Sequence, residues 1–291
     1  MRAEIVLLLG AAIWGLGWMP LAHFAGKGLS GMPLVLCTYG LLSALAVPLV
    51  LSQRRQWWPQ RNALLAICMF GGWATAGLVA ALSEGDVVRA MLLFYLAPVW
   101  GLIGGRVLFG ERLTPPRLGA LLLAMGGIAL TLGVSRETFR PLGASDWLAL
   151  SAGFAFALNN LATRAAEQVP LTSKAVVGFI GSAVLGGLFC WLQGTPLLAV
   201  DAQQWLQLAA FGLFWLAAMG AAQYGFSHVE ASRAAVLVVI ELLVAVLTAA
   251  WIGERELGLR EWLGGSLVLA AALIAARPSP EPSPTLCEAE S

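Results

Sequence analysis

Long apolar runs separated by short polar breaks divide this chain into ten segments. Nearly every segment reaches or approaches the roughly 20 residues that an α-helix needs to cross a bilayer. The runs are continuously apolar and do not alternate, which argues against a membrane β-barrel. The pattern predicts ten transmembrane helices, at 3–22, 32–51, 62–82, 87–108, 116–133, 146–163, 173–192, 204–225, 232–252 and 261–276.

Composition supports this interpretation. Of the 291 residues, 59% are hydrophobic and only 11% are charged, and the mean hydropathy is +0.81. Soluble domains usually carry about 25% charged residues, and a soluble chain could not hide so much apolar surface from water. We therefore expect an all-α membrane protein in contact with the lipid bilayer. The net charge of +1 gives no indication of a nucleic-acid partner.

The two ends of the chain differ in character. The first apolar run superficially resembles a signal peptide, but it exceeds the roughly 7–15 apolar residues of a signal sequence, so we expect a retained first span. Residues 277–291 are rich in proline and acids, which predicts a disordered cytoplasmic tail.

The distribution of Lys and Arg predicts an orientation, because short cytoplasmic loops are enriched in both. If the N-terminus is cytoplasmic, eleven of the 17 Lys and Arg residues fall on the cytoplasmic side. We therefore expect a multi-pass protein of the inner (plasma) membrane with both termini in the cytoplasm.

The two halves of the chain share a pattern. Gly-Glu-Arg triplets occur at 110–112 and 253–255, 143 residues apart, and each precedes a Gly-rich apolar span. Five spans per half is an odd number, so the sequence predicts two repeats, 1–134 and 135–276, that cross the membrane in opposite senses. Inverted repeats characterise secondary transporters, whose sites lie near the midplane. A duplicated channel or membrane enzyme is the alternative.

Glu241 is the only charged residue near the middle of a predicted span. Ionisable groups at that depth are costly and usually face a cavity or a partner. Glu241 could accept a proton as a coupling group or hold a substrate ammonium. Because burial disfavours the charged form, it could equally be a neutral carboxyl bonded to a neighbouring helix.

Other mid-span polar and aromatic residues are candidates for a binding site. Four tryptophans carry an indole N–H that needs an acceptor, which a wet cavity or a helix contact could supply. The tyrosines, Gln223 and the pair Asn159-Asn160 could hold a carboxylate or amine, or join helices. A proline within 87–108 bends its helix, as at many transporter gates. The candidate substrate-binding residues are Trp14, Tyr39, Trp73, Tyr95, Trp100, Asn159, Trp215, Gln223, Tyr224 and Glu241, with Pro98 as the candidate gating residue.

Several motifs are missing from the sequence. There is no phosphate-binding loop, metalloprotease helix or serine-hydrolase elbow, so we expect no enzyme, no cofactor and no evident use of ATP. The cysteines and histidines lack metal-ligand spacing, so no metal site is predicted. Mid-span Lys and Arg are absent, so a phosphorylated substrate would lack its usual clamp.

Four stretches resemble the EamA-type repeat of the drug/metabolite transporter superfamily. They are Ala-Ala-Ile-Trp-Gly at 11–15, Tyr-Leu-Ala-Pro at 95–98, Gly-Glu-Arg-Leu-Thr at 110–114 and the Gly-rich stretch 118–128. The resemblance covers all ten spans. It implies ten helices, cytoplasmic termini, and a central cavity lined by spans 1, 3, 4, 6, 8 and 9, in which Trp73 and Trp215 occupy similar places. The sequence is similar to amino-acid exporters, including the YddG-like aromatic amino-acid branch.

The second half departs from the family pattern. Phe154-Ala155 stands where Trp-Gly is expected, and Glu241 stands where the first half has Pro98, so site residues do not transfer symmetrically. We expect a monomer or homodimer that exports small metabolites by alternating access. Amino acids with apolar or aromatic side chains are the expected substrates. Lipophilic cationic drugs with Glu241 as counter-charge are the main alternative, and an intramembrane enzyme or scaffold is the more distant one.

Overall fold

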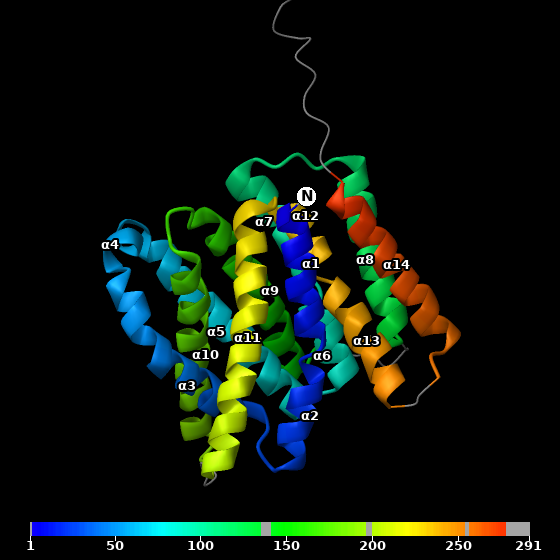
Figure 1. Ribbon diagram of the computed structural model, residues 1–291. Helices are drawn as coiled ribbons and strands as arrows, with labels where there is room; N and C mark the ends of the chain where they lie inside the picture. Colours follow the sequence, from blue (N-terminus) through cyan, green and yellow to red (C-terminus); the bar gives the residue numbers. More distant parts are fainter. Residues whose placement is uncertain (1, 135–140, 196–199, 254–255, 278–291) are drawn as a thin grey trace, which may run out of the picture.

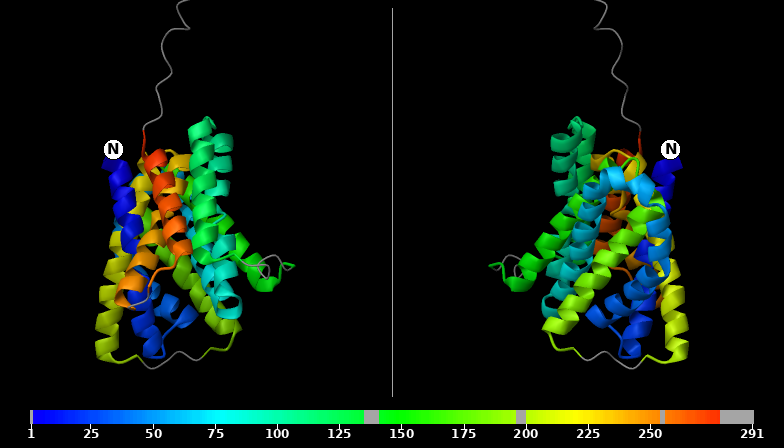
Figure 2. Two further views of the ribbon diagram at one scale, coloured as in Figure 1. Left: turned by 90° about the vertical axis from the view of Figure 1, so that its right-hand side faces the viewer. Right: turned by 90° about the vertical axis from the view of Figure 1, so that its left-hand side faces the viewer.

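The computed structural model describes residues 2–134, 141–195, 200–253 and 256–277, and these ranges contain helices and no strand. The helices form one bundle (Figures 1 and 2). The N-terminus and the C-terminal end of α14 lie at the same end of the bundle, which we call the terminal end (Figure 1). We call the opposite end the distal end. The predicted tail, apart from Arg277, and Glu254-Arg255 of the second triplet lie outside the described residues.

In the first half of the chain, the described residues form eight α-helices. They are α1 (Arg2–Gly15), α2 (Trp18–Gly26), α3 (Gly31–Ser52), α4 (Arg54–Trp57), α5 (Arg61–Glu84), α6 (Val87–Phe94), α7 (Ala97–Phe109) and α8 (Pro115–Leu132), with a 3-10 turn at Trp58–Gln60. The second half contains six. They are α9 (Ala144–Ala165), α10 (Leu171–Leu192), α11 (Ala202–His228), α12 (Ala231–Leu237), α13 (Ile240–Ile252) and α14 (Leu259–Ala276).

Three predicted spans are broken into two helices each, which corrects the prediction of continuous helices. The breaks separate α1 from α2, α6 from α7, and α12 from α13. Pro98 lies in the first turn of α7, where its missing N–H costs no helical hydrogen bond, so it follows a break and does not bend a continuous helix. Val238 and Val239 form the break before α13, and neither valine predicts an interruption.

Helices lie at all ten predicted segments. In the described ranges, nine helices or consecutive helix pairs are long and apolar enough to cross a membrane, so the protein is a multi-pass helical membrane protein. The predicted span 146–163 corresponds to α9, which has 22 residues but is not among the nine. The helix is too polar, with Asp146, Asn159 and Thr163 among its buried residues.

Glycines allow the closest helix contacts. A Cβ atom on Gly72 of α5 would lie 2.5 Å from the backbone of Gly181 in α10. A Cβ atom on Gly127 of α8 would lie 2.7 Å from the carbonyl oxygen of Gly264 in α14, and these two helices lie side by side (Figure 2). Any side chain at these positions would push the helices apart, as in other membrane bundles.

Two of the three broken spans, α6–α7 and α12–α13, run in opposite directions, and we call these two the broken helices. The first rises from α6 to α7 at the terminal end, and the second descends from α12 to α13 (Figure 1). Arg89 of α6 forms an ion pair with Asp146 of α9 at 2.8 Å. Arg233 of α12 forms one with Glu4 of α1 at 3.0 Å. Each broken helix is therefore tied by an ion pair to the first helix of the other half, and the pair is buried for Arg89–Asp146 and half-buried for Arg233–Glu4.

Candidate functional site

A cavity of about 330 Å³ lies at the centre of the bundle. Its lining comes from both halves of the chain, namely α1, α2, α3, α5, α6, α9, α10, α11 and α13, with Tyr95 after α6. Gly31, the first residue of α3, and Leu82, near the last residue of α5, line it, and both of these helix ends lie at the distal end of the bundle (Figure 1). The cavity therefore extends from the centre of the bundle towards the distal end.

Aromatic rings form much of the cavity wall. Trp14 of α1 meets Trp215 of α11 edge to face, with ring centroids 5.8 Å apart, and meets Phe156 of α9 at 6.1 Å. Tyr39 of α3 stacks on Phe179 of α10 at 5.0 Å. All five residues line the cavity. Rings held in this way offer both faces and edges to an apolar or aromatic group.

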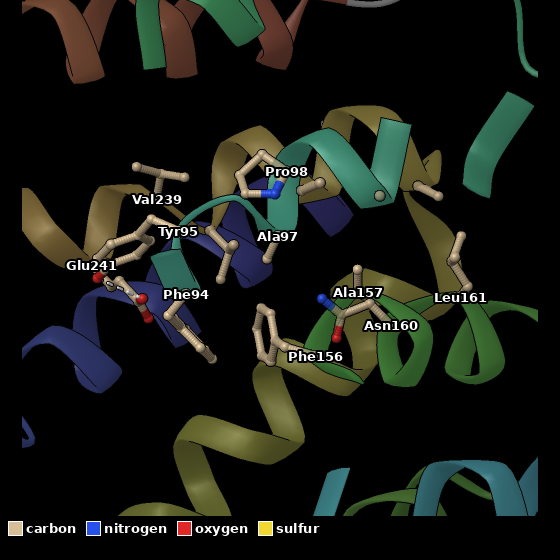
Figure 3. Close-up of a pocket in the computed structure, with 14 residues that line it drawn as sticks. Phe94, Tyr95, Ala97, Pro98, Phe156, Ala157, Asn160, Leu161, Val239 and Glu241 are labelled. Atoms are coloured by element: carbon tan, nitrogen blue, oxygen red, sulfur yellow. Dashed lines mark hydrogen bonds between the residues drawn. The ribbon is translucent and has the colours of Figure 1, made fainter. Parts of the chain in front are cut away.

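The breaks of the two broken helices meet at Glu241 and Tyr95. The Tyr95 hydroxyl donates a hydrogen bond of 3.0 Å to Glu241 Oε1 (Figure 3). Glu241 lies in the first turn of α13, where the helix dipole favours a negative charge. Gly15 of α1 packs directly on the Glu241 backbone, and Gly153 of α9 packs on that of Phe94. The neighbouring helices therefore hold both breaks in place.

A smaller pocket adjoins this pair. It has a volume of about 20 Å³, which is room for about one water molecule. It shares Tyr95, Phe156 and Glu241 with the cavity, and Pro98 and Asn160 line it as well (Figure 3). The carboxyl group of Glu241 can therefore contact water without facing lipid.

Neutral polar groups line another part of the cavity. Thr38, Asn159, Ser182 and Gln223 belong to α3, α9, α10 and α11. Among the described residues, Thr38 Oγ1 and Asn159 Oδ1 are buried without a hydrogen-bond partner. Because buried polar atoms are nearly always satisfied, a solute or water in the cavity is the natural partner for both.

The terminal end of the bundle is closed around Glu111. Its carboxylate accepts the backbone N–H groups of Ala231 at 2.7 Å and Ser232 at 3.0 Å, and the Ser232 hydroxyl at 2.5 Å. These N–H groups belong to the first turn of α12, so a residue of the first half caps a helix of the second. The guanidinium of Arg164 lies 3.6 Å from the same carboxylate.

Further contacts extend this closure across α8, α10 and α11. Arg117 pairs with Glu230 at 2.5 Å. The Lys174 ammonium donates to the Thr163 carbonyl oxygen at 2.9 Å and to Ser227 Oγ at 2.8 Å. We call Glu111, Arg117, Arg164, Lys174 and Glu230 the terminal seal.

The structure brings seven of the ten candidate residues together around the cavity, and they come from both halves of the chain. They are Trp14, Tyr39, Tyr95, Asn159, Trp215, Gln223 and Glu241. Lining the cavity does not test substrate binding, which stays a prediction.

Three candidates lie outside the cavity lining. The Trp73 indole donates to Ser151 at 3.1 Å, between α5 and α9. Trp100 meets Phe154 edge to face at 5.4 Å, and Tyr224 stacks on the neighbouring His228 at 4.3 Å. These side chains make contacts within or between helices, the alternative that the sequence left open.

Sequence reasoning did not identify all of the cavity residues. Phe156, Phe179 and Thr38 carry no signal that separates them from other apolar or small residues of a span. Lys174 was counted with the cytoplasmic loops, but it lies in the first turn of α10 and is only 2% exposed. Its position within an apolar run was the one signal in the sequence that could have indicated a buried lysine.

Comparisons with known proteins give a matching family model, similar transporters and a shared fold. The model of the EamA-like transporter family matches residues 1–133 and 143–277. An uncharacterized transporter of Archaeoglobus fulgidus is 30% identical over 226 residues, which cover 75% of this chain and 77% of that protein. An uncharacterized transporter of Pseudomonas aeruginosa is 30% identical over 188 residues, covering 60% and 58%. A solved crystal structure shares the fold with a TM-score of 0.76 at 20% identity, covering 94% and 96%.

Proposed function

Because the chain belongs to the EamA-like transporter family, we propose that it is a secondary transporter that exports amino acids with apolar or aromatic side chains. The observation that carries this proposal is the central cavity. Its volume of about 330 Å³ lies within the range of small-molecule sites. Aromatic walls and a single carboxylate suit a solute with an apolar body and one amino group.

Glu241 is proposed to hold the ammonium group of the solute. It is the one charged residue among the described residues that line the cavity. A charge-assisted hydrogen bond from an ammonium to this carboxylate is about twice as strong as a neutral one. The side chain of the solute would then lie against Trp14 and Trp215.

The proposed architecture is two inverted repeats of five spans, 1–134 and 135–276, with α9 as the tenth span. The opposite directions of the two broken helices support it (Figure 1). So does the family model, which matches the chain in two segments. The repeats would move against each other to expose the cavity at one end and then at the other.

We propose that the protein lies in the inner membrane of the cell and that its terminal end faces the cytoplasm. The bias of Lys and Arg towards that end supports it. The cavity extends towards the distal end and the terminal seal closes the other. In this orientation the structure corresponds to an outward-open state.

Counterflow in liposomes tests the proposal. Purified protein is reconstituted with an excess of unlabelled solute inside, and uptake of labelled phenylalanine, tryptophan, leucine and glutamate is measured. We expect exchange of the first three and little exchange of glutamate. Glu241→Gln should reduce exchange about tenfold, through loss of a charged hydrogen bond. Glu84→Gln, which removes an exposed carboxylate at the end of α5, should have no effect.

An absence of exchange above protein-free liposomes for every amino acid would refute the amino-acid proposal. The test needs no assumption about coupling ions, because counterflow is driven by the solute gradient alone.

A second candidate function is export of lipophilic cations. The favouring observation is that no Lys or Arg of the described residues lines the cavity, so its fixed charge is negative. Cells that produce the protein are compared with cells that produce Glu241→Gln for resistance to cationic drugs and for efflux of labelled phenylalanine. Lost resistance with unchanged phenylalanine efflux would favour this candidate over the first.

A further inference from the structure

A buried cation lies behind the closed end of the cavity. Lys174 is only 2% exposed, and its ammonium donates to the Thr163 carbonyl oxygen and to Ser227 Oγ. Among the described residues, no carboxylate lies within 4 Å of this ammonium. Glu167 acts on the ammonium only from beyond that distance, so two neutral oxygens and a more distant carboxylate offset only part of the cost of burying the charge.

Gln223 connects this lysine to the cavity. The Thr163 hydroxyl donates to Gln223 Oε1 at 2.7 Å, and the Ser227 hydroxyl donates to the Gln223 carbonyl oxygen at 2.8 Å. The two residues that bind the ammonium therefore also hold Gln223. The hydrogen bond from Thr163 fixes the position of the amide oxygen of Gln223. It therefore also fixes the direction in which the NH₂ group can donate.

Among the described residues, the NH₂ group of Gln223 has no strong acceptor. It donates to the sulfur of Met219 at 3.6 Å, which is a weak acceptor. Gln223 and Met219 both line the cavity, and Gln223 is 1% exposed. A donor in this position, with a positive charge behind it and little water to screen that charge, attracts an anion strongly.

We propose that Gln223, supported by Lys174, forms an anion subsite that binds the carboxylate of the transported solute. Glu241 binds the ammonium in a separate part of the same cavity, so the protein selects zwitterions over amines. The inference rests on the proposed function, and it assigns the carboxylate a partner where mid-span Lys and Arg are missing. Lys174 acts as a positioning residue through Gln223 and does not touch the solute.

A purely structural role for Lys174 predicts a different result. In that case the lysine only joins α9, α10 and α11 at the terminal seal, and its loss slows the transport of every solute by the same factor. The anion subsite predicts a loss confined to solutes with a carboxylate. The ratio of two transport rates separates these roles.

The experiment compares L-phenylalanine with phenethylamine, which keeps the ring and the amine but has no carboxylate. Counterflow of both is measured in liposomes for each variant. We expect Lys174→Met to lower the phenylalanine rate at least about tenfold relative to phenethylamine, and Lys174→Arg to keep the wild-type ratio. Lys27→Met removes the other lysine of the chain, which is exposed and bonded to Gln207, and should leave the ratio unchanged.

Gln223→Leu tests the anion subsite independently if Lys174→Met does not fold. It keeps the lysine and removes the donor, so the phenylalanine rate should again fall selectively. Equal losses for both solutes, or no loss for either, would overturn the inference. Wild-type protein that carries phenethylamine but no amino acid would refute both the anion subsite and amino-acid export, and would favour the cation-export candidate. Wild-type protein that carries phenylalanine and loses no selectivity in either variant would refute the anion subsite alone.

Discussion

At the residue scale, the contact between Tyr95 and Glu241 shows what sequence can and cannot predict. Polarity within an apolar run selected both residues, because such groups need a reason to be buried. Their contact was not predictable, because the sequence neighbours of Glu241 are all apolar and its partner is 146 residues away. An indole at mid-span is less informative, since Trp73 finds its acceptor in Ser151 between two helices.

Tyr95→Phe removes the hydroxyl that positions Glu241 and leaves the ring in place. We expect the concentration for half-maximal exchange of phenylalanine to rise about fivefold, because one hydrogen bond to a carboxyl group is lost. Tyr224→Phe is the matched control, since Tyr224 lies outside the cavity lining and stacks on His228. Equal half-saturation concentrations for Tyr95→Phe and the wild type would show that the hydroxyl does not position the carboxyl group.

At the scale of helices, hydropathy predicts that a segment is helical but not where it breaks. A run of apolar residues looks the same whether one helix or two cross the bilayer, so the segment at 232–252 gave no sign of its break. The segment at 3–22 did carry a signal that the prediction of one helix passed over, namely Gly15, Gly17 and Pro20 around its break. The segment with Pro98 carried a signal too, since proline lacks a backbone donor. The cap on the first turn of α12 comes from a distant residue, Glu111, and no local pattern reveals such a pairing.

Glu111→Ala should destabilise the protein, because it leaves the first turn of α12 uncapped and Arg164 without its carboxylate. We expect a loss of about 2 kcal/mol in the free energy of unfolding. Tryptophan fluorescence during denaturation in detergent measures it. Glu84→Ala, an exposed carboxylate with one long contact to Gln193, should change stability by less than about 0.5 kcal/mol. Similar stabilities for the two variants would contradict the capping role.

At the scale of the whole molecule, the cavity is open at one end and sealed at the other. The spacing of the two Gly-Glu-Arg triplets predicted similar halves, but not which end would be open, because both states use the same residues. Packing decides it. Glu111, Arg117 and Arg164 join the two halves at the terminal end, whereas the cavity lining extends towards the distal end as far as Gly31 and Leu82.

One-sided thiol labelling tests the opening and the orientation together. In a background without native cysteines, Thr75→Cys places a thiol in the cavity, and Ser52→Cys places one on the exposed terminal end of α3. A maleimide that cannot cross the membrane is added to intact cells. We expect it to label Thr75→Cys and to spare Ser52→Cys until the cells are broken. The reverse pattern would place the termini outside.

The polarity of α9 has a consequence for how the protein enters the membrane during synthesis. A helix with Asn159, Asn160 and Arg164 gains too little from lipid to be retained alone, yet Asp146 at its start pairs with Arg89 of the preceding α6. We therefore expect α9 to be retained in the membrane through contacts with helices that have already inserted. In chains truncated after residue 165, Arg89→Leu should let α9 pass completely to the outer side more often, and a glycosylation site placed after residue 165 would detect that failure.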